Sequence, residues 1–110
     1  MNIPEELIDE HGYPTEEALA FIRDFKPTKQ YSTVWFAREF LPLIVWNPEW
    51  CLWYKRPYKG VQKIFFSTGG WSGNEDIIDA IERNIFLTHF KLSLVSWKAG
   101  GHYGFELKLP

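Results

Sequence analysis

The chain has 110 residues, of which 45% are hydrophobic and 24% are charged, and this composition predicts a single globular domain. A chain of this length buries about two-thirds of its extended surface, which excludes bulk disorder and removes the need for disulfide bridges. Its single cysteine, Cys51, cannot form an internal disulfide, and no stretch approaches the ~18 apolar residues of a membrane span. The first ten residues are acidic and unlike a signal peptide, so we expect a cytoplasmic domain.

The net charge of −2 hides an alternation of acidic and basic blocks. Residues 1–25 and 72–84 are acidic, whereas residues 26–71 and 85–110 are basic. Opposite blocks that face each other or water explain this pattern without any partner. The alternative is a basic face built from Lys55, Arg56, Lys59 and Lys63. Because duplex-binding domains are strongly basic and this chain is mildly acidic, nucleic acid ranks low among the partners that we expect.

Aromatic residues are unusually frequent, with six Trp, five Tyr and nine Phe. Each buries about 150–250 Å² when it lies in a core, and a small domain has little room for all of them. We therefore expect some exposed aromatic surface, which is typical of binding faces.

Helical signals fill the first half of the chain. Pro4 and Gly12 are typical of the start and end of a short first helix. Thr15 is a candidate cap for a helix over residues 15–25, and Ser32 for a helix over residues 33–41. Pro42 either kinks or ends that second helix, and the apolar run 41–46 would also suit a buried strand. Asn47-Pro48 predicts a turn.

Beyond residue 50 the pattern changes to that of strands, which we predict over residues 51–56, 61–67, 89–97 and 102–109. The loop 56–60 has the length and the Pro and Gly of a hairpin connection. Apolar spacing predicts one further helix over residues 74–84. The order α-α-β-β-α-β-β predicts an α+β fold, in which helices pack on one face of an antiparallel four-stranded sheet.

Six of the eight glycines fall into two clusters, Gly69, Gly70 and Gly73 in one and Gly100, Gly101 and Gly104 in the other. The first cluster lies between a predicted strand and a predicted helix, where glycine-rich loops hold phosphate in many proteins. A structural explanation competes with this one, because Ser72 and Glu75 have the spacing of a capping box, which would satisfy the start of the helix. The lysine of a Walker-type loop is also missing.

The second cluster flanks His102, a polar-phase residue of its strand whose pKa range suits acid–base work or a hydrogen bond to a ligand. We therefore predict one ligand-binding groove between the clusters, with Trp97 beside it. Its residues are Gly69, Gly70, Trp71, Ser72, Gly73, Asn74, Gly100, Gly101, His102 and Tyr103. The structural alternative is that both clusters are only tight turns.

The string Ser67-Thr68-Gly69-Gly70-Trp71-Ser72-Gly73-Asn74-Glu75, followed by Gly100-Gly101-His102-Tyr103 and Phe105, resembles a group of small proteins from bacteriophages and prophages. The segments Pro14-Thr15-Glu16-Glu17-Ala18-Leu19 and Asn47-Pro48-Glu49-Trp50 resemble the same group. The resemblance implies a phage-related origin and action in the bacterial cytoplasm. It implies no activity and no catalytic residue.

Our leading functional hypothesis is a small non-catalytic binding protein that captures a small, anionic ligand or blocks a host protein. One alternative is a small enzyme acting on a phosphate or acyl ester, with His102 as the base and the amides of residues 69–73 as anion stabilisers. Another is single-stranded nucleic-acid binding, in which aromatic rings stack on bases beside the lysines of residues 55–63. The scattered His11, His89, His102 and Cys51 have no ligand spacing, so we expect neither a metal nor a cofactor.

Overall fold

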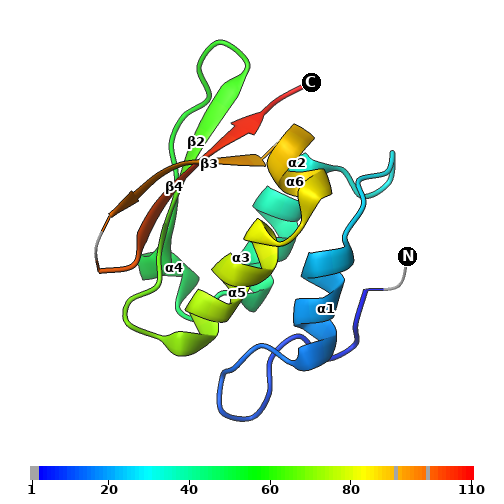
Figure 1. The fold of residues 1–110 in the computed structure, drawn as a ribbon, viewed down its shortest axis with the longest axis vertical. Coiled ribbons are helices and arrows are strands. Elements are labelled where there is room, and N and C mark those ends of the chain that lie inside the picture. The colour runs from blue at the N-terminus through cyan, green and yellow to red at the C-terminus, as the bar shows by residue number, and fades with distance from the viewer. Residues whose placement is uncertain (1–2, 91, 99) are drawn as a thin grey trace.

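The computed structural model describes residues 3–90, 92–98 and 100–110 (Figure 1). The helical segments are α1 (Glu16–Asp24), α2 (Thr33–Trp35), the π-helical η1 (Phe36–Phe40), α3 (Leu41–Ile44), α4 (Pro48–Cys51), α5 (Ser72–Glu82) and α6 (Ile85–Phe90). The strands are β1 (Leu52–Tyr54), β2 (Val61–Ser67), β3 (Leu92–Lys98) and β4 (His102–Lys108). The predicted α+β fold with an antiparallel four-stranded sheet is confirmed.

The four strands lie in the order β1-β2-β4-β3, and each neighbouring pair is antiparallel. Because β4 separates β2 from β3, these two strands run in the same direction and finish at the same end of the sheet. The glycine loops that follow them therefore meet at the start of β4 (Figure 1).

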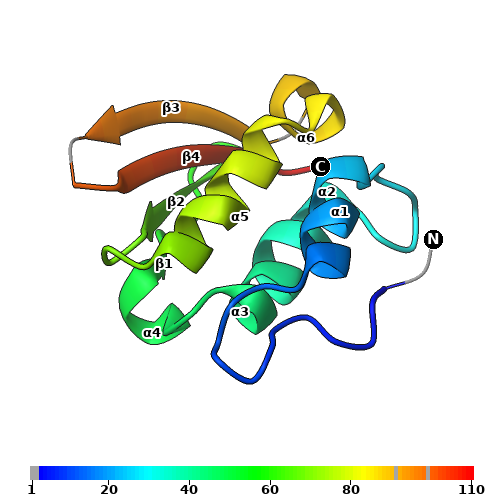
Figure 2. The ribbon, with the colours of Figure 1, turned by 60° about the horizontal axis from the view of Figure 1, so that its bottom comes forward.

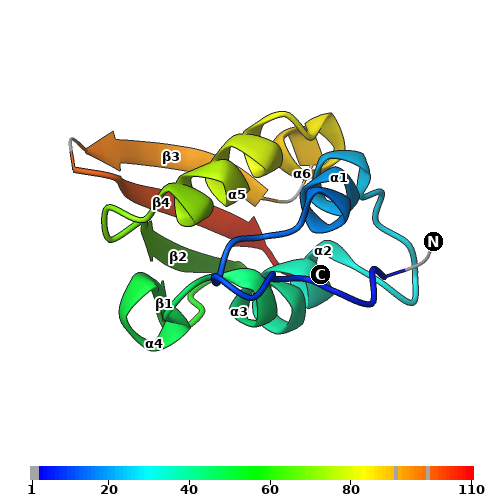
Figure 3. The same ribbon diagram turned by 90° about the horizontal axis from the view of Figure 1, so that it is seen from below.

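One face of the sheet is covered by helices, and the other is exposed (Figures 2 and 3). Along β2, the side chains of Gln62, Ile64 and Phe66 are buried, whereas those of Lys63 and Phe65 are exposed. This alternation is typical of an antiparallel sheet that packs on a core with one face only. We call the uncovered side the open face; it carries the side chains of Trp53, Lys63, Phe65, Ser67 and His102.

Three of the four predicted strands differ from the structure at one end or at both. Strand β2 has the predicted bounds, and β4 ends one residue earlier than predicted. The predicted strand 51–56 begins only at Leu52, because Cys51 closes the short helix α4, and it ends at Tyr54, two residues earlier than predicted. The predicted strand 89–97 begins only at Leu92, since α6 occupies the residues before it.

Asn84 is the reason for α6. Its buried side-chain oxygen accepts hydrogen bonds from the amides of Phe86 at 2.9 Å and Leu87 at 3.1 Å, which starts the helix. Its side-chain amide donates to the carbonyls of Ile22 at 2.7 Å and Phe25 at 2.8 Å, at the end of α1. Asn84 lies two residues after the end of α5 and directly before α6. Its side chain therefore connects these two helices to the end of α1.

The predicted helix between Pro4 and Gly12 is wrong. No helix lies before α1 in residues 3–14. Instead the carboxylate of Asp9 accepts hydrogen bonds from the amides of His11 at 2.9 Å and Tyr13 at 3.0 Å, and Gly12 has a positive φ of 84°. An aspartate that bonds the amides just after it favours a turn over a helix.

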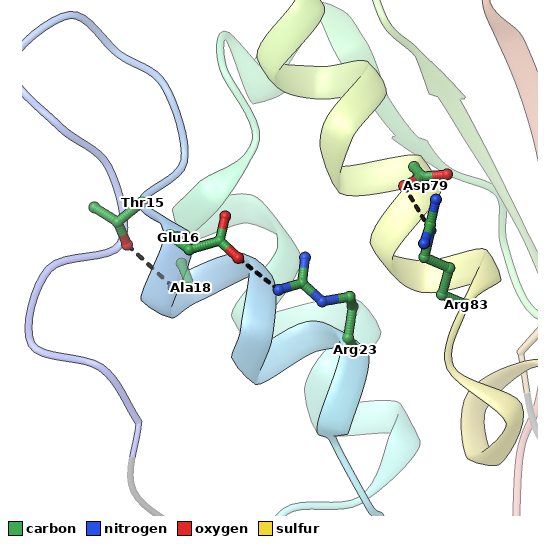
Figure 4. A network of polar contacts seen from close by, with 6 residues as sticks. All are labelled: Thr15, Glu16, Ala18, Arg23, Asp79 and Arg83. Atoms are coloured by element: carbon green, nitrogen blue, oxygen red, sulfur yellow. Dashed lines mark hydrogen bonds and ion pairs between the residues drawn. The ribbon is translucent and has the colours of Figure 1, made fainter.

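Helix α1 begins as predicted, because the Thr15 hydroxyl accepts a hydrogen bond from the amide of Ala18 at 3.1 Å (Figure 4). The same hydroxyl donates to the Glu6 carbonyl at 2.8 Å, which ties the N-terminal segment to the helix. Arg23 pairs with Glu16 at 2.6 Å along the exposed side of α1 (Figure 4).

Residues 33–44 are helical throughout, so the alternative of a buried strand beginning at Leu41 is wrong. Ser32 caps the segment as predicted and accepts from the amide of Trp35 at 3.0 Å. The helix continues through Pro42, but the turn before this proline is a π-helical turn, which is wider than an α-turn.

Within that wider turn, the amide of Leu41 donates to the carbonyl of Phe36, five residues back. The next bond of this series would join Pro42 to the carbonyl of Ala37, but proline has no N–H to donate. The Tyr54 hydroxyl donates to the Ala37 carbonyl instead, at 2.6 Å. Strand β1 therefore supplies the donor that proline withholds, and the helix is attached to the edge of the sheet.

Candidate functional site

The two glycine loops lie against each other at one end of the sheet. The amide of Thr68 donates to the carbonyl of Gly101 at 2.9 Å, and Ser67 is the register partner of His102. Gly69, Gly70, Gly100 and Gly101 all have positive φ values, between 62° and 94°. At Gly101 a side chain is also excluded by contact, because its Cβ would overlap the Thr68 hydroxyl. The turn geometry alone therefore explains these glycines.

The predicted capping box at Ser72 is wrong. Helix α5 already begins at Ser72, with Trp71 as the residue before it and no capping side chain. The amides of Asn74 and Glu75 both donate to the Trp71 carbonyl, at 3.1 and 3.2 Å. A backbone carbonyl thus takes the place that the sequence pattern assigns to the serine hydroxyl.

Asn74 is the buried polar residue that anchors this loop. Its side-chain oxygen accepts from the amide of Trp46 at 2.9 Å. Its side-chain amide donates to the carbonyls of Trp46 at 3.2 Å and Thr68 at 3.3 Å. All its polar atoms face protein, so Asn74, which we predicted as a ligand-binding residue, lies inside the fold and has no free group to offer.

Trp71 lies in an aromatic stack with Tyr13 and Trp46. The ring centroids of Tyr13 and Trp71 are 4.6 Å apart, and those of Trp46 and Trp71 are 5.1 Å apart. Gly73 permits this packing, because its Cβ would lie 2.8 Å from the indole nitrogen of Trp71. The ten predicted residues therefore divide into a structural group around Trp71 and a second group around His102.

His102 and Tyr103 line a cavity of about 440 Å³ where β1 begins, β2 ends and β4 begins. The lining residues are Trp50, Cys51, Trp53, Phe65, Phe66, Ser67, His102, Tyr103 and Gly104. We call it the sheet-end cavity. Both glycine loops adjoin it, since Gly69 approaches the Cys51 sulfur and Gly100 approaches the His102 ring.

The cavity is dominated by aromatic side chains that face solvent. Trp50 is 81% exposed and Trp53 is 69% exposed, and the Trp53 and Phe65 rings are 5.6 Å apart. Opposite Phe65 the register position is Gly104, which has no side chain and is buried.

Sequence reasoning missed Trp50, Trp53 and Phe65. The signal for two of them is present in the strands: Phe65 lies on the same phase as Lys63, and Trp53 on the same phase as Lys55. An aromatic residue on the polar phase of an amphipathic strand points to solvent, where it contributes nothing to the core. The Trp97 side chain, which we placed beside the groove, lies outside the described side chains.

The site offers hydrogen bonds but no assembled nucleophile. Among the described residues, no hydrogen bond joins the side chains of Ser67 and His102, which a serine nucleophile would need. Burial raises the pKa of the Cys51 thiol, although a hydrogen bond with Asn74 lowers it in part. A thiol with a raised pKa is a weak nucleophile. The described part of the chain also contains no cluster of three or more His, Cys, Asp or Glu side chains that could hold a metal ion.

No family model, no curated protein and no solved structure matches the chain. None of the helices in residues 3–90, 92–98 and 100–110 is long and apolar enough to cross a bilayer.

Proposed function

We propose that the protein is a non-catalytic binding protein whose sheet-end cavity receives a flat ring, carried by a small ligand or by a host protein. The observation that carries the proposal is the exposure of Trp50 and Trp53 beside Phe65 in one cavity. Two exposed indoles offer about 300 Å² or more of ring surface, and covering such surface contributes roughly 25 cal/mol per Å².

Polar groups that line the cavity would orient a bound ring through hydrogen bonds. Ser67 and His102 face each other across β2 and β4, and each offers a donor or an acceptor to the edge of a ring. A mostly apolar cavity with a few convergent polar groups is the usual form of a small-molecule site. The cavity volume of about 440 Å³ is within the usual range for such sites.

The resemblance to small phage proteins suggests where the protein would bind its ligand. In that setting the protein acts in the cytoplasm of a bacterial host, and the ring belongs to a host component. Binding without turnover is favoured over ester hydrolysis, because the cavity holds a buried, weakly nucleophilic thiol and an uncoupled serine–histidine pair.

Amide chemical-shift perturbation tests the proposal with tryptophan, adenosine and thymidine as probes. We expect shifts confined to residues 50–54, 65–67 and 102–104, and we expect the probes to be recovered unchanged. Trp53→Ala should abolish the shifts, whereas Leu43→Ala, which removes an exposed apolar side chain on α3, should leave them intact. Shifts spread over the whole surface, or none at millimolar probe concentrations, would refute the proposed site.

A further inference from the structure

The open face continues from the sheet-end cavity into a basic region on the same two strands. Trp53 and Phe65 are register partners. The amide of Lys55 donates to the carbonyl of Lys63 at 2.9 Å, which extends the pairing one residue beyond β1. Residues two apart on a strand share a face and lie about 7 Å apart. Each aromatic side chain of this pair therefore has an exposed lysine as its next neighbour on the open face.

The hairpin tip adds a third ring and more positive charge. Tyr58 is 72% exposed, and the Lys59 ammonium lies 5.4 Å from the centre of its ring. A second cavity of about 350 Å³ lies here, lined by Lys55, Arg56, Tyr58, Val61, Lys63 and Glu106. None of the bases at residues 55–63 forms an ion pair with a described residue, so their charge is available to a partner.

The acidic residues lie mainly on the other side of the molecule. Eleven of the fourteen acids belong to residues 5–24 and to α5, which form the helical side (Figure 3). The two arginines there, Arg23 and Arg83, are already paired with neighbouring carboxylates (Figure 4). The net charge of −2, which ranked nucleic acid low among the expected partners, therefore does not describe the open face.

We propose that the open face binds single-stranded nucleic acid, an inference that rests on the proposed ring-binding function of the sheet-end cavity. One base stacks on Trp53 and Phe65 in the cavity, and the following phosphates lie against Lys55 and Lys63. Tyr58 offers a second stacking surface at the hairpin tip. A single strand fits this arrangement better than a duplex, because the bases of a duplex stack on each other and cannot present their faces to aromatic side chains.

Fluorescence anisotropy of labelled dT8 and rU8 oligonucleotides tests the inference. Each phosphate neutralised on a single strand contributes about −0.7 to the slope of log affinity against log salt, so three or four contacts predict a slope of about −2 to −3. We expect Lys63→Gln to reduce this slope by about 0.7, and Trp53→Ala to weaken binding by about fivefold or more. Binding of either polymer with these dependences supports the inference.

Matched controls lie on the helical side, where Lys26→Gln and Leu43→Ala remove an exposed charge and an exposed apolar side chain. Circular dichroism and thermal melts establish that every variant is folded. Equal weakening by the control variants, or duplex binding as tight as that of the single strand, overturns the inference. If thymidine enters the cavity but dT8 and rU8 bind no more tightly and without salt dependence, the inference is wrong and the proposed function stands. If neither thymidine nor an oligonucleotide binds, both are wrong.

Discussion

Replacing Asn74 by alanine is expected to destabilise the fold without touching the exposed surface. The substitution removes three hydrogen bonds, one from the Trp46 amide and two to the carbonyls of Trp46 and Thr68. The Thr68 carbonyl keeps its hydrogen bond from the Trp71 amide, but the amide and the carbonyl of Trp46 are left without a partner. Each such group costs about 1–3 kcal/mol, so the low end of this range predicts a loss of about 2 kcal/mol. For a domain of this length that loss lowers Tm by about 8 °C.

Urea unfolding followed by tryptophan fluorescence measures the loss, with Glu82→Ala on the exposed side of α5 as the control. The control is expected to stay within about 0.5 kcal/mol of the parent protein. The slope of the unfolding free energy against urea should be unchanged in both variants, because neither alters the surface that unfolding exposes. A loss below about 1 kcal/mol for Asn74→Ala would refute the anchoring role of this residue.

Asn74→Asp keeps the side-chain oxygen that accepts from the Trp46 amide but removes the N–H groups that donate to the two carbonyls. The introduced carboxylate can still accept from the Trp46 amide, but it faces two carbonyl oxygens in a buried site, which raises its folded-state pKa above the ordinary value of about 3.9. Because the folded pKa is the higher one, the variant is closest to the parent below pH 4 and loses relative stability as the pH rises through the folded pKa. A stability difference that does not change between pH 3.5 and pH 8 would contradict this account.

Three further substitutions test the local structure. Ser72→Ala is expected to change the free energy of unfolding by less than about 0.5 kcal/mol, whereas Thr15→Ala should cost about 1 kcal/mol; equal losses in urea titrations would contradict the capping assignment. Gly101→Ala is expected to lower the free energy of unfolding by about 3 kcal/mol, because the new Cβ is strained by the positive φ and meets the Thr68 side chain. Gly70→Ala should cost only about 1 kcal/mol, since nothing lies within 4 Å of a Cβ at Gly70. A lower Tm for Gly70→Ala than for Gly101→Ala would be inconsistent with the loop packing. Burial raises the pKa of Tyr54 to about 12, so its contribution to stability is complete below pH 10 and lost as the pH rises from 10 to 12. Tyr54→Phe should cost about 1–2 kcal/mol at pH 7 and lose less stability than the parent across that window, as alkaline unfolding curves will measure.

The elements that could be predicted from the sequence are those with a local cause. The alternation of apolar and polar residues specifies β2 and β4, because a strand places successive side chains on opposite faces. Capping by Thr15 and Ser32 was predictable for the same reason, since each hydroxyl reaches an amide three residues ahead. The hairpin between β1 and β2 follows from the glycine and proline of its loop.

The contacts between distant segments could not be predicted in this way, because they depend on the tertiary fold. Asn74 and Asn84 bond to backbone groups up to 62 residues away, and no sequence spacing encodes such partners. The same is true of the turn of Trp71 towards Tyr13, which removes it from the groove that we predicted. Strand order is likewise non-local: the position of β4 between β2 and β3 brings the glycine loops together, and strand pairing depends on the packing of the whole core.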